Sequence, residues 1–93
     1  MTNYAKGANK ERMVKKVLEA AGMTCVRSSG SHGPVDLVAW NKDRIYFLQI
    51  KYNCRITDAE LNALEAMQVP ASGEVAVWEY VKGNTKPKIK RIK

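Results

Sequence analysis

The sequence predicts an α/β (α+β) fold in which the elements follow the order αβββαβ(β). Three observations support this prediction: an apolar repeat of helical period near the N-terminus, two apolar segments around a short polar turn, and a capping sequence before a second apolar repeat. A chain of 93 residues can bury one core and has no room for a second. We therefore expect a single domain over residues 1–93, with a basic C-terminal segment at residues 82–93.

The first predicted element is a helix over about residues 8–21. Its apolar residues recur at helical spacing, which predicts one buried face. They are Met13, Val14, Val17, Leu18 and Ala21. Gly22 is suited to end this helix, residues 23–27 predict a strand, and the Ser and Gly content of residues 28–33 predicts a loop.

The apolar segments 35–40 and 45–51 predict a β-hairpin that turns at Lys42-Asp43. Strand residues two apart share a face, so Gln49 and Lys51 project together, and this register sets Asp36 directly opposite Gln49. Aspartate is a poor strand residue among such neighbours, which suggests a role for it. An acid, an amide oxygen and a lysine in one cluster offer hard oxygen ligands for a divalent cation beside an ammonium group. This combination indicates a site for phosphodiester hydrolysis.

The second half of the chain predicts a helix and two strands. Thr57-Asp58-Ala59-Glu60 is a capping box, and the helix that it starts should turn Leu61, Leu64 and Met67 to the core and end before Val69-Pro70. Residues 74–81 alternate as a strand does, Gly83-Asn84 predicts a turn, and residues 86–92 predict a returning edge strand.

Pro34-Val35-Asp36 and Gln49-Ile50-Lys51 resemble the two halves of the motif of the PD-(D/E)XK nuclease superfamily. Together with the helix opened by residues 7–12 and the serine-containing loop at residues 27–33, they are similar to the archaeal Holliday junction resolvases over about residues 5–68. The resemblance implies a restriction-endonuclease-like core, with a central mixed sheet flanked by helices. It departs at Gln49, where those resolvases have a glutamate and the virus-type replication-repair nuclease domains have a glutamine.

The resemblance also implies which residues form the active site. Asp36, Gln49, the Ile50 carbonyl and Glu11 are expected to hold Mg²⁺, for which Mn²⁺ should substitute, while Lys51 and Ser31 complete the catalytic set. A glutamine at position 49 is expected to weaken the affinity for magnesium without abolishing it.

Each of these assignments has a plainer alternative. Glu11 is also placed to form an ion pair with Lys15 one helical turn later, and Asp36 to accept hydrogen bonds from the amides of residues 29–33. The alternative for Lys51 is a strand-end lysine that extends to solvent. Ser29 is the second choice for the resolvase-like serine, and His32 is more often a phosphate or solvent contact than a general base.

The positive charge of the chain is concentrated at its C-terminal end. Six of the 16 basic residues lie at positions 82–93, which contain no acid, and this leaves ten basic and nine acidic residues elsewhere. Such a segment is typical of contacts with phosphates, although a solubilising terminus is the alternative. The residues expected to bind nucleic acid are Lys10, Arg27, Ser29, Ser31, His32, Arg55, Lys86, Lys88, Lys90 and Arg91.

Three functions are compatible with these patterns. The first is a Mg²⁺-dependent endonuclease that acts on branched DNA as a C2 homodimer, because resolution of a four-way junction needs two symmetric nicks. The second is a nuclease of the same superfamily that acts on flaps, nicks or restriction-type sites, and the third is an inactive nucleic-acid-binding module. The sequence has no apolar run of 18 residues and no apolar N-terminal segment, so we expect a cytoplasmic protein that does not bind membranes and keeps Cys25 and Cys54 reduced.

Overall fold

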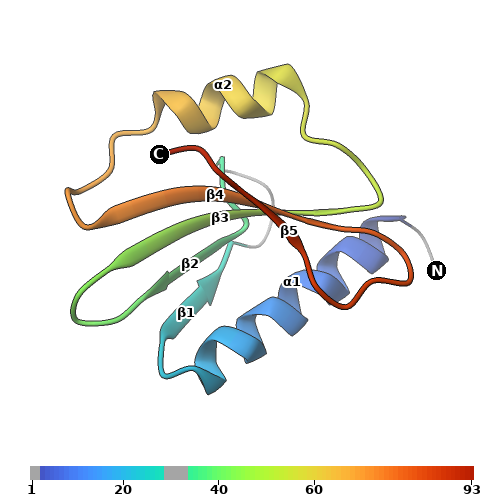
Figure 1. The fold of residues 1–93 in the computed structure, drawn as a ribbon, viewed down its shortest axis with the longest axis horizontal. Coiled ribbons are helices and arrows are strands. Elements are labelled where there is room, and N and C mark those ends of the chain that lie inside the picture. The colour runs from blue at the N-terminus through green and yellow to red at the C-terminus, as the bar shows by residue number, and fades with distance from the viewer. Residues whose placement is uncertain (1–2, 29–33) are drawn as a thin grey trace.

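The computed structural model describes the backbone of residues 3–28 and 34–93, and side chains from residue 9 onward within these ranges. Five strands form one sheet with a helix packed against each face (Figure 1). The elements are α1 Asn3–Ala20, β1 Thr24–Arg27, β2 Leu37–Trp40, β3 Ile45–Tyr52, α2 Asp58–Ala66, β4 Gly73–Tyr80 and β5 Lys88–Arg91. The predicted α+β fold and its element order are confirmed.

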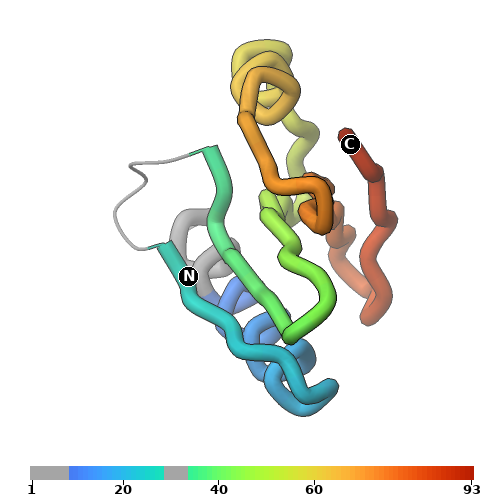
Figure 2. Tube along the Cα trace, turned by 90° about the vertical axis from the view of Figure 1, so that its left-hand side faces the viewer, coloured from blue at the N-terminus to red at the C-terminus, as the bar shows by residue number. Residues whose placement is uncertain are grey.

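The sheet is mixed, as predicted. Its strands lie in the order in which they occur along the chain, from β1 at one edge to β5 at the other (Figure 2). All neighbouring pairs are antiparallel except β3 and β4, which are parallel. Parallel neighbours need a long connection, and α2 supplies it between β3 and β4.

Helix α1 differs from the prediction at its start and along its apolar stripe. It begins at Asn3, five residues before the predicted start at residue 8. Val14 is fully buried and Leu18 is partly buried, but Met13 and Val17 are exposed, so the predicted buried stripe is wrong in part. A helix that lies against a sheet buries a narrow strip, and α1 packs mainly against β1, β2 and β3.

Gly22 ends α1 as predicted. Its φ of +91° is a left-handed conformation that glycine adopts without the steric cost of a Cβ atom. The Gly22 N–H donates to the Glu19 carbonyl at 3.0 Å and the Met23 N–H donates to the Leu18 carbonyl at 3.1 Å. These two bonds form a Schellman motif, which turns the chain into β1.

Two apolar clusters cover the two faces of the sheet. Val14 and Leu18 of α1 pack with Leu48 and Ile50 of β3 on one face. Leu64 of α2 packs with Val75, Val77 and Phe47 on the other. Because strand side chains alternate, residues 48 and 50 of β3 face α1, and Gln49 and Lys51 face α2.

The C-terminal part of the chain forms the predicted edge strand. Gly83, at φ +92°, lies in the turn, where the Asn84 N–H donates to the Val81 carbonyl at 3.0 Å. Strand β5 then pairs antiparallel with β4, and the Lys93 ammonium donates to the Met67 carbonyl at 2.6 Å, beyond the end of α2. Within the described part of the chain, no helix is long and apolar enough to cross a membrane.

Candidate active site

The hairpin of β2 and β3 sets the register of the candidate site. Its pairs run from Leu37 with Leu48 to Trp40 with Ile45, and Lys42-Asp43 forms the turn, as predicted. The Asn41 Oδ1 accepts hydrogen bonds from the backbone N–H groups of Asp43 and Arg44, each at 2.9 Å, which fixes the turn. The paired register ends at Leu37, and the Asp36 N–H donates to the carbonyl of Leu48, the partner of Leu37, at 2.8 Å. The predicted pair of Asp36 directly opposite Gln49 is therefore not formed, because the ladder is interrupted just before β2.

Asp36 lies just before β2 and turns its carboxylate toward the end of β3. Its Oδ2 accepts a hydrogen bond from the Ile50 N–H at 2.8 Å. Burial raises the pKa of Asp36 above its ordinary value, although the Ile50 N–H and the Lys51 ammonium act in the opposite direction. The alternative donors predicted for this carboxylate, the amides of residues 29–33, lie outside the described residues.

Gln49 is the buried polar side chain of the site, with an exposed fraction of 9%. Among the described residues, no buried side-chain nitrogen or oxygen is left without a hydrogen-bond partner. The N–H and carbonyl of one strand residue point toward the same neighbouring strand. Because the Ile50 N–H reaches Asp36, the Ile50 carbonyl also faces the side where Asp36 lies. The structure thus brings the Asp36 carboxylate to the backbone of Ile50, the residue that follows Gln49.

Lys51 pairs with Glu60, whose only predicted role was in the capping box of the second helix. The Lys51 Nζ lies 2.5 Å from the Glu60 Oε2, and the Lys51 side chain is 15% exposed. Burial acts to raise the pKa of Glu60, but the hydrogen bonds from Lys51 and Thr57 outweigh it and lower the pKa. One observation in the sequence could have revealed this contact. The capping box opens the helix that directly follows the strand carrying Lys51, so its first turn lies near the end of that strand.

Glu11 approaches from α1, on the opposite face of the sheet. Its Oε1 accepts from the Arg27 Nε at 2.9 Å. The alternative ion pair of Glu11 with Lys15 is wrong, because Lys15 pairs with Glu19 at 3.5 Å. Burial and the nearby charge of Asp36 raise the pKa of Glu11, and Arg27 opposes this shift. Glu11 and Asp36 are therefore close enough to interact electrostatically.

The residues predicted to contact nucleic acid occupy different surroundings. Arg27 is held by Glu11, and the Lys10 ammonium lies over the rings of Tyr80 at 4.7 Å and Tyr52 at 5.5 Å. Arg91 pairs with Glu74 at 3.5 Å. Five predicted residues are exposed: Arg55, Lys86, Lys88, Lys90 and Arg91. Ser29, Ser31 and His32 lie outside the described residues.

The pairing of the strands shows where the lysines of β5 lie relative to the candidate site. Paired strand residues share a face, so the row of Lys51, Glu79 and Lys88 points toward the α2 side of the sheet. The row of Gln49, Val77 and Lys90 points to the same side. Two strand spacings, about 10 Å, separate the site from the lysines of β5.

The described residues contain no group of three or more His, Cys, Asp or Glu side chains arranged to hold a metal ion. A metal at the predicted position would therefore need the amide of Gln49 and the carbonyl of Ile50 as well as carboxylates. Both oxygens are of the hard type that Mg²⁺ prefers.

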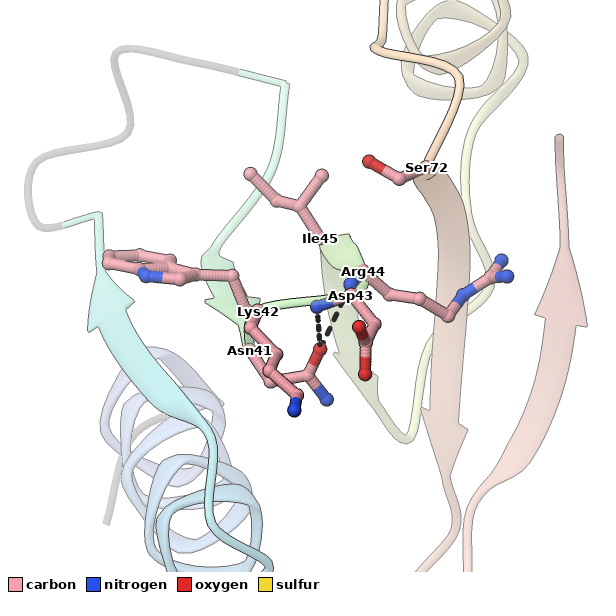
Figure 3. A pocket seen from close by; sticks show the side chains of 7 residues that line it. Asn41, Lys42, Asp43, Arg44, Ile45 and Ser72 are labelled. Carbon is pink, nitrogen blue, oxygen red and sulfur yellow. Dashed lines mark hydrogen bonds between the residues drawn. The ribbon is translucent and has the colours of Figure 1, made fainter.

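A pocket of about 380 Å³ lies at the turn of the hairpin, at the opposite end of these strands from Asp36 and Gln49 (Figure 3). Trp40 lines this pocket and is 36% exposed. None of the predicted site residues lines it.

Comparisons with known proteins identify the family. The family model described as archaeal Holliday junction resolvase (Hjc) matches residues 2–63. The crossover junction endodeoxyribonuclease Hjc of Methanocaldococcus jannaschii is 42% identical over 48 residues, which are 52% of this chain. The match spans 35% of the length of that relative.

The fold agrees with that of a solved structure. Hjc of Archaeoglobus fulgidus, a Holliday junction resolvase from an archaeal hyperthermophile, is similar over 94% of this chain and 73% of its own, with a TM-score of 0.76 and 20% identity. This likeness confirms the restriction-endonuclease-like fold, and the family model covers well over half of the chain. The chain belongs to the archaeal Holliday junction resolvase family of the PD-(D/E)XK nuclease superfamily.

Proposed function

We propose that this protein is a metal-dependent endonuclease that hydrolyses phosphodiester bonds in branched DNA, with four-way junctions as its preferred substrate. The observation that carries the proposal is the convergence of Asp36, Gln49, the Ile50 carbonyl and Lys51 at one end of the hairpin. The name of the matching family, and that of the relative from M. jannaschii, support the same substrate class.

The residues present fit a magnesium ion. In this site the Asp36 carboxylate accepts from the Ile50 N–H, and the amide oxygen of Gln49 and the carbonyl of Ile50 are oxygen ligands of the hard type that Mg²⁺ prefers. Asp36, Gln49 and the Ile50 carbonyl would hold Mg²⁺, or Mn²⁺ in its place, with Glu11 contributing directly or through water. When bound, the metal polarises the phosphate and activates a water molecule.

The side chains of the chain itself orient the substrate and stabilise charge. The Ile50 N–H fixes one oxygen of Asp36, which leaves the other oxygen for the site. The Lys51 ammonium donates hydrogen bonds and stabilises the negative charge that develops on the phosphate group in the transition state. Arg27 holds Glu11 beside Asp36, and Ser31 is proposed to contact the phosphate.

DNA would lie across the α2 side of the sheet. Lys88 and Lys90 share this side with Gln49 and Lys51, so one duplex arm can contact both the site and the edge strand. Lys10, Arg27, Arg55, Lys86 and Arg91, together with Ser29, Ser31 and His32 of the neighbouring loop, complete the proposed contacts with the phosphate backbone. A C2 homodimer would present two such sites for two symmetric nicks.

Cleavage of labelled DNA tests the proposal. Four-way junctions, flaps, nicked duplexes and single strands are each incubated with Mg²⁺, with Mn²⁺ and with EDTA. We expect cleavage of the junction with either metal and none with EDTA. Cleavage of flaps or nicked duplexes in preference to junctions would instead establish the alternative substrate class.

The neutral side chain of Gln49 favours a second candidate, an inactive module that binds nucleic acid. An amide supplies a weaker ligand than a carboxylate, because it carries no charge. Tight binding of the junction without cleavage in any metal would establish this second function.

A further inference from the structure

The carboxylate of Glu60 is held at both of its oxygens. Its Oε1 accepts from the Thr57 N–H at 2.9 Å, while the Glu60 N–H donates to the Thr57 Oγ1 at 3.1 Å, which completes the capping box. Its Oε2 accepts from the Lys51 Nζ at 2.5 Å. The first turn of α2 is therefore tied to the strand that carries the candidate site.

Lys51 has few other constraints. Lysine is a compact charge on a flexible stem, so its ammonium adopts one position only where a partner holds it. The Lys51 side chain is 15% exposed, and it points to the α2 face beside Gln49, whose side chain is uncharged. A charge-assisted bond to a carboxylate that is itself fixed supplies the missing constraint.

We propose that Glu60 is a positioning residue, whose carboxylate, fixed by the capping box of α2, orients the Lys51 ammonium for phosphodiester cleavage. The inference rests on the proposed function and extends the site to a second element. Asp36 and Glu60 then flank Lys51 from the hairpin and from the helix. The cap of α2 serves both the helix and the site.

The variant Glu60→Gln separates these two roles. Glutamine also fills the third position of a capping box, so the bond from the Thr57 N–H is kept while the charge that faces Lys51 is removed. Asp58→Asn is the matched control, because Asp58 is an exposed acid in the same helical turn and its replacement changes the net charge equally.

We expect Glu60→Gln to lower the cleavage rate constant at saturating junction by about 10- to 100-fold, the usual range for residues that orient a site. Its Kd for the junction and its calorimetric affinity for Mn²⁺ should equal those of the wild type. The proton–nitrogen correlation signal of the Lys51 ammonium should be sharp in the wild type and in Asp58→Asn, and broadened or lost in Glu60→Gln. Thermal unfolding verifies that both variants are folded.

Three results would overturn the inference. They are wild-type cleavage by Glu60→Gln, an unchanged Lys51 ammonium signal in that variant, and a loss of Mn²⁺ affinity, which would make Glu60 a metal ligand instead. If the wild-type protein cuts no substrate, the proposed function fails on its own. The ammonium signal then still decides whether Glu60 fixes Lys51.

Discussion

At the scale of single residues, the candidate site combines a carboxylate that has one fixed oxygen with a buried amide. Asp36 is held by the Ile50 N–H, and Gln49 is the buried amide. Lys51 is oriented by Glu60. We therefore expect the chemistry of the proposed site and the affinity for DNA to depend on different side chains.

We expect Asp36→Ala and Lys51→Ala each to reduce cleavage of a four-way junction by at least about 100-fold, as is usual when a group that stabilises transition-state charge is removed. Binding of the junction, measured by gel shift in Ca²⁺, should change little, because the proposed phosphate contacts remain. Full cleavage activity in either variant contradicts the assignment of the active site.

The replacement Gln49→Glu tests the role of residue 49, where this chain has a glutamine and the resolvases have a glutamate. It adds a charged ligand at nearly the same volume and should lower the magnesium concentration needed for half-maximal cleavage. Without metal, the buried charge should destabilise the variant by about 1–3 kcal/mol, and magnesium should restore its melting temperature. If the magnesium titrations coincide and Gln49→Ala is also active, residue 49 does not contact the metal.

Stability should depend on pH through Asp36. Burial raises the pKa of this carboxyl in the folded protein, so the folded state binds the proton more tightly than the unfolded chain. The resulting stability is complete below the ordinary aspartate value and is lost as the pH rises through the raised value. The side chain in Asp36→Asn can still accept a hydrogen bond from the Ile50 N–H. Because it does not ionise, this variant does not lose stability as the pH rises. In metal-free buffer, its free energy of unfolding relative to the wild type should increase from about pH 4 to about pH 7.

At the scale of elements, local chemistry accounts for the elements that the sequence predicted well. The capping box fixes the start of α2, and the two-residue turn fixes the register of β2 with β3. The exposure of Met13 and Val17 was not predictable, because it depends on how much of the sheet α1 covers. Glu60 was missed because one carboxylate serves both a cap and a lysine that is nine residues earlier.

The alternating faces of β5 make a prediction about DNA binding. Lys88 and Lys90 point to the side of the site, whereas Arg91 points to the other side and pairs with Glu74. The double variant Lys88→Gln/Lys90→Gln should weaken DNA binding and flatten its salt dependence by up to about 0.9 per lost phosphate contact. Measurement of Kd against salt concentration provides the test. Arg91→Gln, which removes one charge from the other face, should change the slope less, and equal slopes for the wild type and the double variant would exclude β5 from the interface.

At the scale of the whole molecule, α1 covers β1 to β3 and leaves the β4 and β5 part of that face to smaller contacts. An apolar groove of about 290 Å³ lies there, between α1 and the edge strand. Trp78 and Ile89 contribute to it, and Ile89 is 55% exposed. The sequence identifies the apolar residues. It does not predict which part of the sheet stays uncovered, because that depends on the placement of α1.

We expect the protein to form a homodimer, because paired nicks in a symmetric junction require two sites related by a two-fold axis. Sedimentation equilibrium should give about twice the monomer mass of 10.4 kDa. Junction cleavage should yield two symmetric nicks within one complex. A monomer that nicks the junction on one strand only would contradict this prediction.

The tight turn at Lys42-Asp43 has a consequence for how the gene tolerates insertions. The turn is solvent-exposed and lies at the opposite end of the hairpin from Asp36, where loops usually accept extra residues. Here an added residue that shifts the pairing by one position would reverse the face of every β2 side chain relative to β3. The contact of the Asp36 carboxylate with the Ile50 N–H would then be lost, and the protein would lose its site through a change that touches none of the site residues. Length at this surface turn is therefore as constrained as identity at the site.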